Sequence, residues 1–422
     1  MMEKIILLGV FLFPFHNFSL SLAESRYDLT AFILLTIAIY FTFKNGSVSE
    51  RTVFYVLAFV SMQLLVFAFI NIAPYPRFIS GIVWLGGLFL ILLSAKKFNY
   101  PKDAVCKIVI YVLLLSAFYI FFQFFYYFGE SRPRAWFGEP SFAGLAFYSA
   151  AAGILSTIIC VKMPTRTRLI LGISFLIFFS SALLTFSTHF VTFLFVITLV
   201  YFLQWPKKKF LSISLKRTLA LLTIGSILAF ISSYLISLEH YSSRLSITDT
   251  IITNLSLLSW LRGFDQMKAS ISNSPVFGNG LGSTGNFEFS SAHSEALESF
   301  NAETLNLLDG YSLAFRLVIE IGLPLFIIFM IYFVRNLYIF RCYLATLMKV
   351  PATQSIPIVF NFVFSTSLII GALLKEPLYP NSCLYLGVFL FATSLPLTVM
   401  DRSKRVLLSS FKQDPLVQSR YR

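Results

Sequence analysis

Residues 105–128 read VCKIVIYVLLLSAFYIFFQFFYYF, and residues 141–161 read SFAGLAFYSAAAGILSTIICV. Between these apolar runs stands GESRPRAWFGEP (129–140), and the second run leads into the basic stretch KMPTRTR (162–168). A run of about 20 apolar residues is long enough to cross a ~30 Å hydrocarbon layer as a helix. The stretch therefore predicts two membrane-spanning helices that are joined by a charged loop.

The rest of the chain repeats this pattern. Of its 422 residues, 57% are hydrophobic and only 12% are charged, whereas about a quarter of the residues in a soluble domain are charged. The sequence therefore predicts an all-α polytopic membrane protein with about 12 transmembrane helices. The predicted spans are 4–21, 28–43, 52–72, 79–95, 105–128, 141–161, 169–186, 188–204, 218–237, 311–334, 355–374 and 382–400.

The cationic side chains fall in alternate loops and so predict an orientation. With the N-terminus in the cytoplasm, all but nine of the 33 Lys and Arg residues lie in cytoplasmic loops and tails. This is the positive-inside pattern, and it predicts that both termini are cytoplasmic. The net charge of +14 is then a topology signal and an attraction to anionic membrane lipids, not a nucleic-acid surface. The outer cations are Arg26, Arg77, Arg132, Arg134, Arg244, Arg262, Lys268, Arg316 and Lys375.

The predicted organisation has four parts. Nine helices occupy 1–237, a large outer loop occupies 238–310, three helices occupy 311–400, and 401–422 form a cytoplasmic tail. A loop of this length is usually functional or disordered, but this one holds enough apolar residues to fold, with one helix predicted around 250–272. The two halves of the chain show no internal repeat, which disfavours a secondary transporter.

The first local motif lies at the outer entrance of the helix predicted at 141–161. Arg134 and Glu139 stand just before Pro140 and Ser141, and proline is common in the first turn of a helix. An ionisable residue at membrane depth is costly to keep there, so a functional role is the default interpretation. The alternative is an Arg134–Glu139 ion pair that braces the loop.

The second motif is the glycine-rich turn SPVFGNGLG, Ser274–Gly282, preceded by Arg262. Glycines such as Gly280 and Gly282 let the backbone turn tightly and approach a ligand, and such a turn can present N–H groups to an anion. Arg262 requires an acidic partner or an anionic ligand, and Arg244 is a further cation on the same loop. A purely structural glycine turn is the alternative.

The third motif places Arg316 and Glu320 four residues apart on one helical face. An ion pair at the membrane edge is one interpretation, since a paired buried charge costs less than a lone one. In the other, Arg316 joins Arg134 and Arg262 around a phosphate-bearing ligand, because the guanidinium fork matches phosphate oxygens. Such a cluster would offset the charge that develops on a diphosphate leaving group. The outer loops contain no carboxylate-rich metal motif, so no metal or cofactor is expected.

Three motifs in this order resemble those of the Wzy-type O-antigen polymerases, members of the O-antigen ligase/polymerase superfamily. They are Arg134 to Ser141, Arg262 to Gly282, and Glu320 to Pro324 in Glu-x-Gly-Leu-Pro. The resemblance covers the topology of nearly the whole chain, and residue-level motifs over about 130–145 and 240–325.

The resemblance implies an inverting, metal-independent glycosyl transfer between undecaprenyl-diphosphate-linked oligosaccharides at the periplasmic face of a bacterial inner membrane. Arginines matching Arg134, Arg262 and Arg244 would hold the diphosphates. A Wzz-type chain-length regulator and a flippase are the protein partners that it implies.

One departure bears on the type of reaction. Ligases of the superfamily usually carry a His-Asn pair where this chain has Tyr311–Ser312, which favours a polymerase. The alternatives are a ligase that transfers polymer to lipid A core and a lipid-oligosaccharide flippase or transporter. The general base is left open among Glu139, Asp309 and His293, with His189 as a further outer histidine.

The candidate site therefore has two tiers. Glu139, Arg134, Arg262 and Arg316 are the predicted catalytic residues. The predicted residues for binding diphosphate or sugar are Arg244, Gly280, Gly282, His293, Asp309 and Lys375.

Overall fold

A computed structural model describes most of the chain. The described residues are 2–15, 19–22, 25–44, 50–70, 73–94, 101–126, 133–137, 139–185, 187–204, 255–286, 289–305, 307, 311–347, 350–376 and 381–394. The ninth predicted span, 218–237, and the predicted tail, 401–422, lie outside them.

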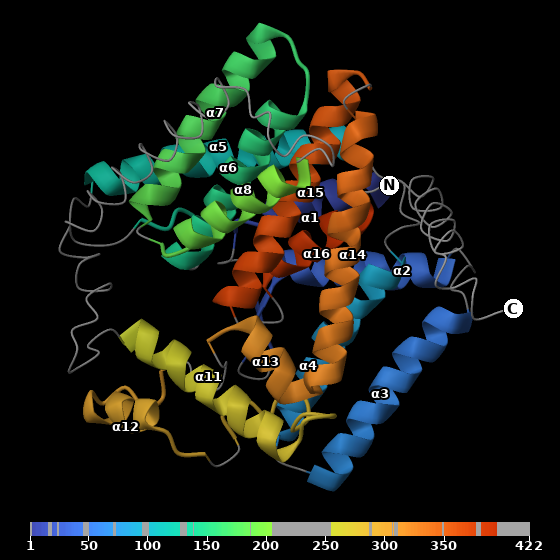
Figure 1. Ribbon diagram of the computed structural model, residues 1–422, viewed down its shortest axis with the longest axis vertical. Helices are drawn as coiled ribbons and strands as arrows, with labels where there is room; N and C mark the ends of the chain where they lie inside the picture. The colour runs from blue at the N-terminus through green and yellow to red at the C-terminus, as the bar shows by residue number, and fades with distance from the viewer. Residues whose placement is uncertain are drawn as a thin grey trace, which may run out of the picture.

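The described elements are almost entirely helical (Figure 1). They are α1 (Met2–Leu12), β1 (Ser19–Leu22), β2 (Ser25–Asp28), α2 (Leu29–Lys44), α3 (Glu50–Ile70), α4 (Tyr75–Ser94), α5 (Lys102–Tyr126), α6 (Pro140–Cys160), α7 (Thr165–Leu184), α8 (Phe190–Gln204), α11 (Leu255–Asn273), α12 (Ala292–Ser299), α13 (Leu313–Ile321), α14 (Leu323–Leu347), α15 (Ala352–Leu374) and α16 (Ser382–Ser394). Within the described ranges, six helices are long and apolar enough to cross a membrane: α4, α5, α6, α7, α14 and α15. The predicted class, a helical membrane protein, is thus supported, and the count of twelve spans stays a prediction.

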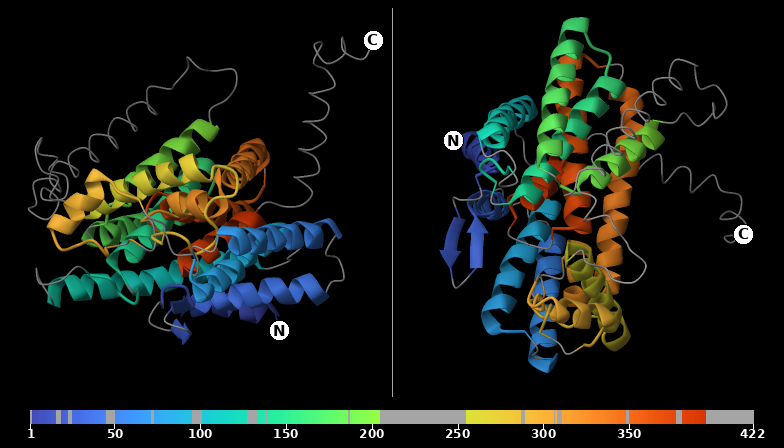
Figure 2. Two further views of the ribbon diagram at one scale, coloured as in Figure 1. Left: turned by 90° about the horizontal axis from the view of Figure 1, so that it is seen from below. Right: turned by 90° about the vertical axis from the view of Figure 1, so that its left-hand side faces the viewer.

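The first predicted span, 4–21, is wrong in its second half. Helix α1 ends at Leu12, and Ser19–Leu22 pairs antiparallel with Ser25–Asp28 in a hairpin near the N-terminus (Figure 2). Pro14 disfavours helix for the residue before it, and SLSL alternates polar and apolar residues with the period of a strand. The hairpin is the described exception to the predicted all-α class.

The predicted span 311–334 is also divided. It forms two helices, because the chain breaks at Gly322, whose φ is +83°. A positive φ is readily adopted only by glycine, and Pro324 then falls in the first turn of α14, where its missing N–H costs little. Helix α14 runs beyond the predicted end to Leu347, and Figure 1 shows α13 turned away from its axis.

Helices α6 and α15 form the centre of the bundle. In the apolar windows of α6 and α15, 83% and 89% of the residues are buried, and Ser149 Oγ donates to Ser367 Oγ at 2.9 Å between the two helices. Gly153 lets α15 approach, since a Cβ there would lie 3.0 Å from the Phe360 ring. Small residues commonly line such close helix contacts in membranes.

The α6–α15 pair also separates two sets of loops. A Cβ at Gly371, near the end of α15, would meet the side chain of Leu145, near the start of α6, whereas Gly153, later in α6, lies against Phe360, earlier in α15. The two helices are therefore antiparallel, and the basic α6–α7 connection lies at the other end of the bundle. Figure 1 shows α11, α12 and α13 gathered toward the lower end, on the side of the α15 terminus. The outer loops of the predicted topology thus converge at one end.

The glycine-rich turn docks onto the α13–α14 break. The Asn279 N–H donates to Ile319 O at 2.7 Å, and the Leu323 N–H donates to Pro275 O at 3.1 Å. Gly278 has φ +67°, and a Cβ there would lie 2.6 Å from Ile319 O. The two loop motifs of the sequence therefore form one joint, held by backbone contact.

We expect Gly278→Ala to destabilise this joint and to lower the apparent Tm of the purified protein in detergent by several degrees. The left-handed backbone alone costs an L-residue about 1–2 kcal/mol, and the Cβ also meets the backbone of α13. Gly86→Ala is the matched control, since a Cβ at Gly86 on α4 meets nothing within 4 Å. Equal Tm values for the two variants would contradict the joint.

Candidate functional site

The candidate site forms around the C-terminal end of α15. The last four carbonyls of a helix have no partner within it, yet here all four are satisfied. The N–H groups of residues 375 and 376 continue the helical pattern and donate to the carbonyls of 371 (3.0 Å) and 372 (3.1 Å). Ser312 Oγ donates to Leu373 O at 2.6 Å, and Trp260 Nε1 donates to Leu374 O at 3.2 Å. The helix end thereby ties α11 and the start of α13 to the bundle.

Two charged residues, Lys375 and Glu376, follow this helix end. Lys375 Nζ donates to Thr188 Oγ1 at 3.0 Å. The buried Glu376 Oε1 lies 3.0 Å from the buried His189 Nε2. His189 Nδ1 lies 3.4 Å from Thr192 Oγ1, so both ring nitrogens have partners. The α7–α8 turn is thus fixed to the end of α15 by a buried acid–histidine pair.

The first sequence motif lies close to this pair. Ser141 Oγ donates to Glu139 Oε2 at 3.2 Å, and Glu139 is exposed. Burial raises the pKa of Glu376, but the hydrogen bond from His189, the charge of Lys375 and the nearby Ser141 hydroxyl outweigh it, so the pKa lies below its ordinary value. Glu376 is therefore a carboxylate.

Arg134 lies on the loop that leads into this motif. Its side chain is exposed, and its backbone N–H donates to Gln123 Oε1 of α5 at 3.1 Å. The same oxygen accepts from the Ala135 N–H at 2.8 Å, where the backbone has φ +49°. Gln123 thus shapes the loop, and the Arg134 side chain is presented at the surface.

Arg262 has a different setting from the one the sequence predicts. It is buried on α11, and its guanidinium donates to the carbonyls of Glu303 (2.5 Å) and Leu305. Burial lowers the pKa of this guanidinium, but arginine remains charged in proteins. Backbone carbonyls, rather than an acidic side chain, are thus its described partners, and it holds the segment after α12 against α11.

A cavity of about 340 Å³ opens beside Arg262. Its lining is mixed: Asn286, Ser294, Glu298 and Glu303 are polar, and Phe289 and Leu307 are apolar. Two carboxylates next to one arginine disfavour a diphosphate, whereas carboxylate, amide and hydroxyl groups suit a ligand rich in hydroxyls. The volume is in the lower range of small-molecule sites.

Arg316 and Glu320 form the buried ion pair that was one of the two sequence interpretations. Arg316 Nε lies 3.0 Å from Glu320 Oε1, and Thr284 Oγ1 donates to the same oxygen at 2.8 Å. The pair therefore joins α13 to the segment after the glycine turn.

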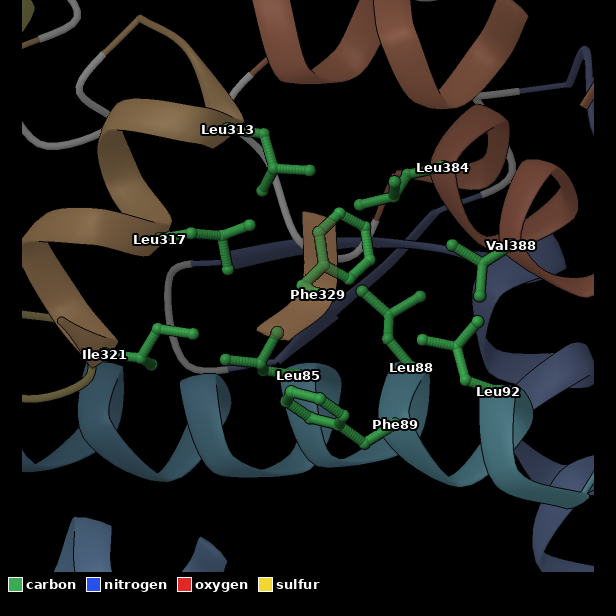
Figure 3. Close-up of a pocket in the computed structure, with 10 residues that line it drawn as sticks. All are labelled: Leu85, Leu88, Phe89, Leu92, Leu313, Leu317, Ile321, Phe329, Leu384 and Val388. Atoms are coloured by element: carbon green, nitrogen blue, oxygen red, sulfur yellow. The ribbon is translucent and has the colours of Figure 1, made fainter. Parts of the chain in front are cut away.

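An adjacent side of α13 faces an apolar pocket (Figure 3). Leu313, Leu317 and Ile321 point into it, opposite Leu85 and Leu88 of α4, with α14 and α16 completing the wall. Leu313, Leu317 and Ile321 recur at spacings of four, which puts them on one helical face. Helix α13 thus carries a charged face and an apolar face at the same level of the bundle.

The remaining predicted site residues are placed as follows. His293 Nδ1 lies 2.6 Å from Asp265 Oδ2 and links α12 to α11. Gly280 and Gly282 have φ values of +89° and +77°, and a Cβ at Gly282 would lie 2.9 Å from the Arg77 backbone of α4. These glycines therefore lie against α3 and α4, and Arg244 and Asp309 are outside the described residues.

Sequence reasoning missed Glu376. The signal was present, because Glu376 directly follows an apolar run of spanning length, the same rule that singled out Glu139. Among the described residues, no three His, Cys, Asp or Glu side chains gather as a metal site would require.

Neither a scan of protein-family models nor a search of curated proteins found a match to the chain.

We expect Glu320→Ala to lower the yield of folded protein sharply. It leaves the Arg316 charge buried without this partner, and breaking a buried pair costs about 3–5 kcal/mol. Replacing both residues, in Arg316→Met/Glu320→Leu, removes the unpaired charge and should recover most of the folded yield, measured by size-exclusion chromatography in detergent. A double variant no better folded than the single would contradict the buried pair.

Proposed function

We propose that the protein is a membrane glycosyltransferase that polymerises oligosaccharide repeat units carried on undecaprenyl diphosphate. One observation supports the proposal: the second and third motifs of the Wzy-type resemblance dock on each other, and the helix that leads into the third, α13, is tied to the end of α15. Leu145, just after the first motif, packs against Gly371 near the same helix end. Ser312, just before the third motif, bonds Leu373 O, and the second motif docks on the third through Thr284 and Glu320.

The proposed reaction is an inverting displacement. A hydroxyl of the incoming repeat unit forms a bond to the reducing-end anomeric carbon of the growing chain, while the bond from that carbon to the diphosphate breaks. The diphosphate leaves with the bonding electrons, and Arg134 and Arg316 offset its charge. The hydroxyl proton passes to Glu139, an exposed carboxylate at this end of the bundle.

Of the two pockets, the one beside Arg262 suits the sugars of such a substrate. The apolar pocket beside α13 is lined by aliphatic and aromatic side chains, but its volume of about 30 Å³ is too small for a polyprenyl chain. The cavity beside Arg262 offers carboxylate, amide and hydroxyl groups, which suits sugars. Arg262 then acts by holding the wall of the sugar cavity through the Glu303 and Leu305 carbonyls.

The position of the buried charges favours an enzyme over a flippase. A transporter is expected to place ionisable residues near the middle of the membrane. Here His189, Glu376, Arg316 and Glu320 gather at the ends of α15 and α8 and along the short α13. A ligase remains the second candidate, and Tyr311–Ser312 in place of its His-Asn pair favours polymerisation. The proposal includes an inner membrane location, cytoplasmic termini, a periplasmic site, and a flippase and a Wzz-type regulator as partners.

A deletion strain tests the reaction class. Loss of a polymerase should leave lipopolysaccharide with a single repeat unit on the core, visible as one band above bare core on a gel. Loss of a ligase should leave bare core alone. An unchanged distribution of chain lengths in the deletion strain would mean that the polymerase proposal is wrong.

Substitutions at Arg134 test the diphosphate contact. Arg134→Ala should abolish complementation of the deletion at normal membrane levels, and Arg134→Lys should recover part of it, because a lysine keeps the charge without the fork of donors. Lys268→Ala is the control, since Lys268 is another cation of the predicted outer side and lies over the Phe264 ring. Full activity in Arg134→Ala would contradict the contact.

A further inference from the structure

The cavity beside Arg262 is lined by one buried charge and two exposed charges. Arg262 is 3% exposed, whereas Glu298 and Glu303 are exposed residues. All three line the same cavity of about 340 Å³. The guanidinium therefore belongs to the inner wall of the cavity, and the two carboxylates lie toward solvent.

The inner wall has hydrogen-bonding capacity that the described residues do not fill. A guanidinium has five N–H donors, and the Arg262 contacts among the described residues are one from Nη1 to Glu303 O and one from Nη2 to Leu305 O. One turn further along α11, Gln266 is 2% exposed, and its Nε2 has no described acceptor. Residues four apart share a helical face, so two buried donor groups on one face of α11 can still bind a ligand.

The remaining walls combine hydrogen-bonding groups with apolar side chains. Asn286 and Ser294 are half-buried, and Asn286 Nδ2 donates to Gly282 O at 3.0 Å, which leaves the amide oxygen as an acceptor. Phe289 and Leu307 supply apolar surface. A sugar residue has hydroxyls that both donate and accept, and C–H groups that pack on apolar surface. The small volume suits one such residue and not a long oligosaccharide.

The charges of the wall select for the charge of the ligand. One guanidinium against two carboxylates leaves one net negative charge in the lining. Among the described residues, the carboxylates of Glu298 and Glu303 have no ion pair or hydrogen bond. Asp265 and His293, from the same two helices, are paired with each other at 2.6 Å. A sugar acid would therefore bring a further negative charge to two carboxylates that no described cation neutralises.

We propose that the cavity beside Arg262 is a subsite for one sugar residue without a carboxylate, and that Glu298 and Glu303 exclude acidic sugars from it. This inference rests on the proposed function, because it names the class of sugar that the polymerase accepts at this position. The hydroxyls of a neutral sugar donate to the two carboxylates and accept from Arg262. An amino sugar adds an ammonium group, which the carboxylates attract, whereas a uronic acid is repelled.

Binding of simple sugars to the purified full-length protein tests the subsite without turnover. The probes are methyl glycosides of the gluco, galacto and manno forms, each as the neutral sugar, the 2-amino sugar and the uronic acid. Saturation-transfer NMR in lipid nanodiscs avoids sugar-based detergents. In the form that binds best, the uronic acid should bind at least roughly 10-fold more weakly than the neutral sugar, because placing like charges together is costly. The difference should shrink in high salt.

Substitution of the two carboxylates tests their role directly. The double variant Glu298→Gln/Glu303→Gln changes only exposed side chains, so it should fold as the wild type does. It should bind the uronic acid as well as the neutral sugar and should lose the added affinity for the amino sugar. Glu295→Gln is the matched control, since Glu295 is another exposed carboxylate of α12 but does not line the cavity.

Three results would overturn the subsite: no saturable binding of any probe, equal binding of the acidic and neutral forms, or the same loss of selectivity in Glu295→Gln. The proposed function can fail separately. Selective binding by a protein that joins no repeat units would overturn only the polymerase. Chain elongation by a protein that does not discriminate among the probes would overturn only the subsite.

Discussion

The end of α15 must satisfy its backbone carbonyls within a largely apolar bundle, and the candidate site is built from the groups that do so. In lipid, each unsatisfied backbone group costs several kcal/mol. Two of the last four carbonyls accept from the N–H groups of Lys375 and Glu376, which continue the helical pattern and so stand at the helix end. The other two bind Ser312 and Trp260, which brings α13 and α11 to the same place. A requirement of one helix terminus thus brings together segments from distant parts of the sequence.

The outer arginines do not all have the same role. On the sequence alone, the outer arginines form one set of candidate phosphate ligands. In the structure they differ: Arg134 is exposed, Arg316 is paired with Glu320, and Arg262 donates to two loop carbonyls. Only a fraction of a cationic cluster can therefore face a ligand, and the remainder shapes the surface on which the ligand would lie.

Much of the fold was predictable from the sequence, because apolar runs of spanning length determine where helices form. The seven spans predicted between 28 and 204 correspond to α2–α8, and the loop helix predicted around 250–272 corresponds to α11. The positions at which a predicted span divides into two helices were less predictable. At Gly322 the hydropathy is continuous, and the division comes from backbone contacts with the glycine turn some forty residues earlier. Local periodicity carries no information about such a contact.

The candidate site was predictable in its motifs but not in its pairings. The i, i+4 spacing was enough to propose the Arg316–Glu320 pair, whereas His189 and Glu376 are 187 residues apart and no local pattern links them. The most direct test of the central claim is a reconstitution of the purified protein in liposomes with one lipid-diphosphate-linked repeat unit. A ladder of longer lipid-linked chains, with one lipid diphosphate released per added unit, is the predicted result. If the repeat units are not joined although the protein is fully folded, the account is contradicted.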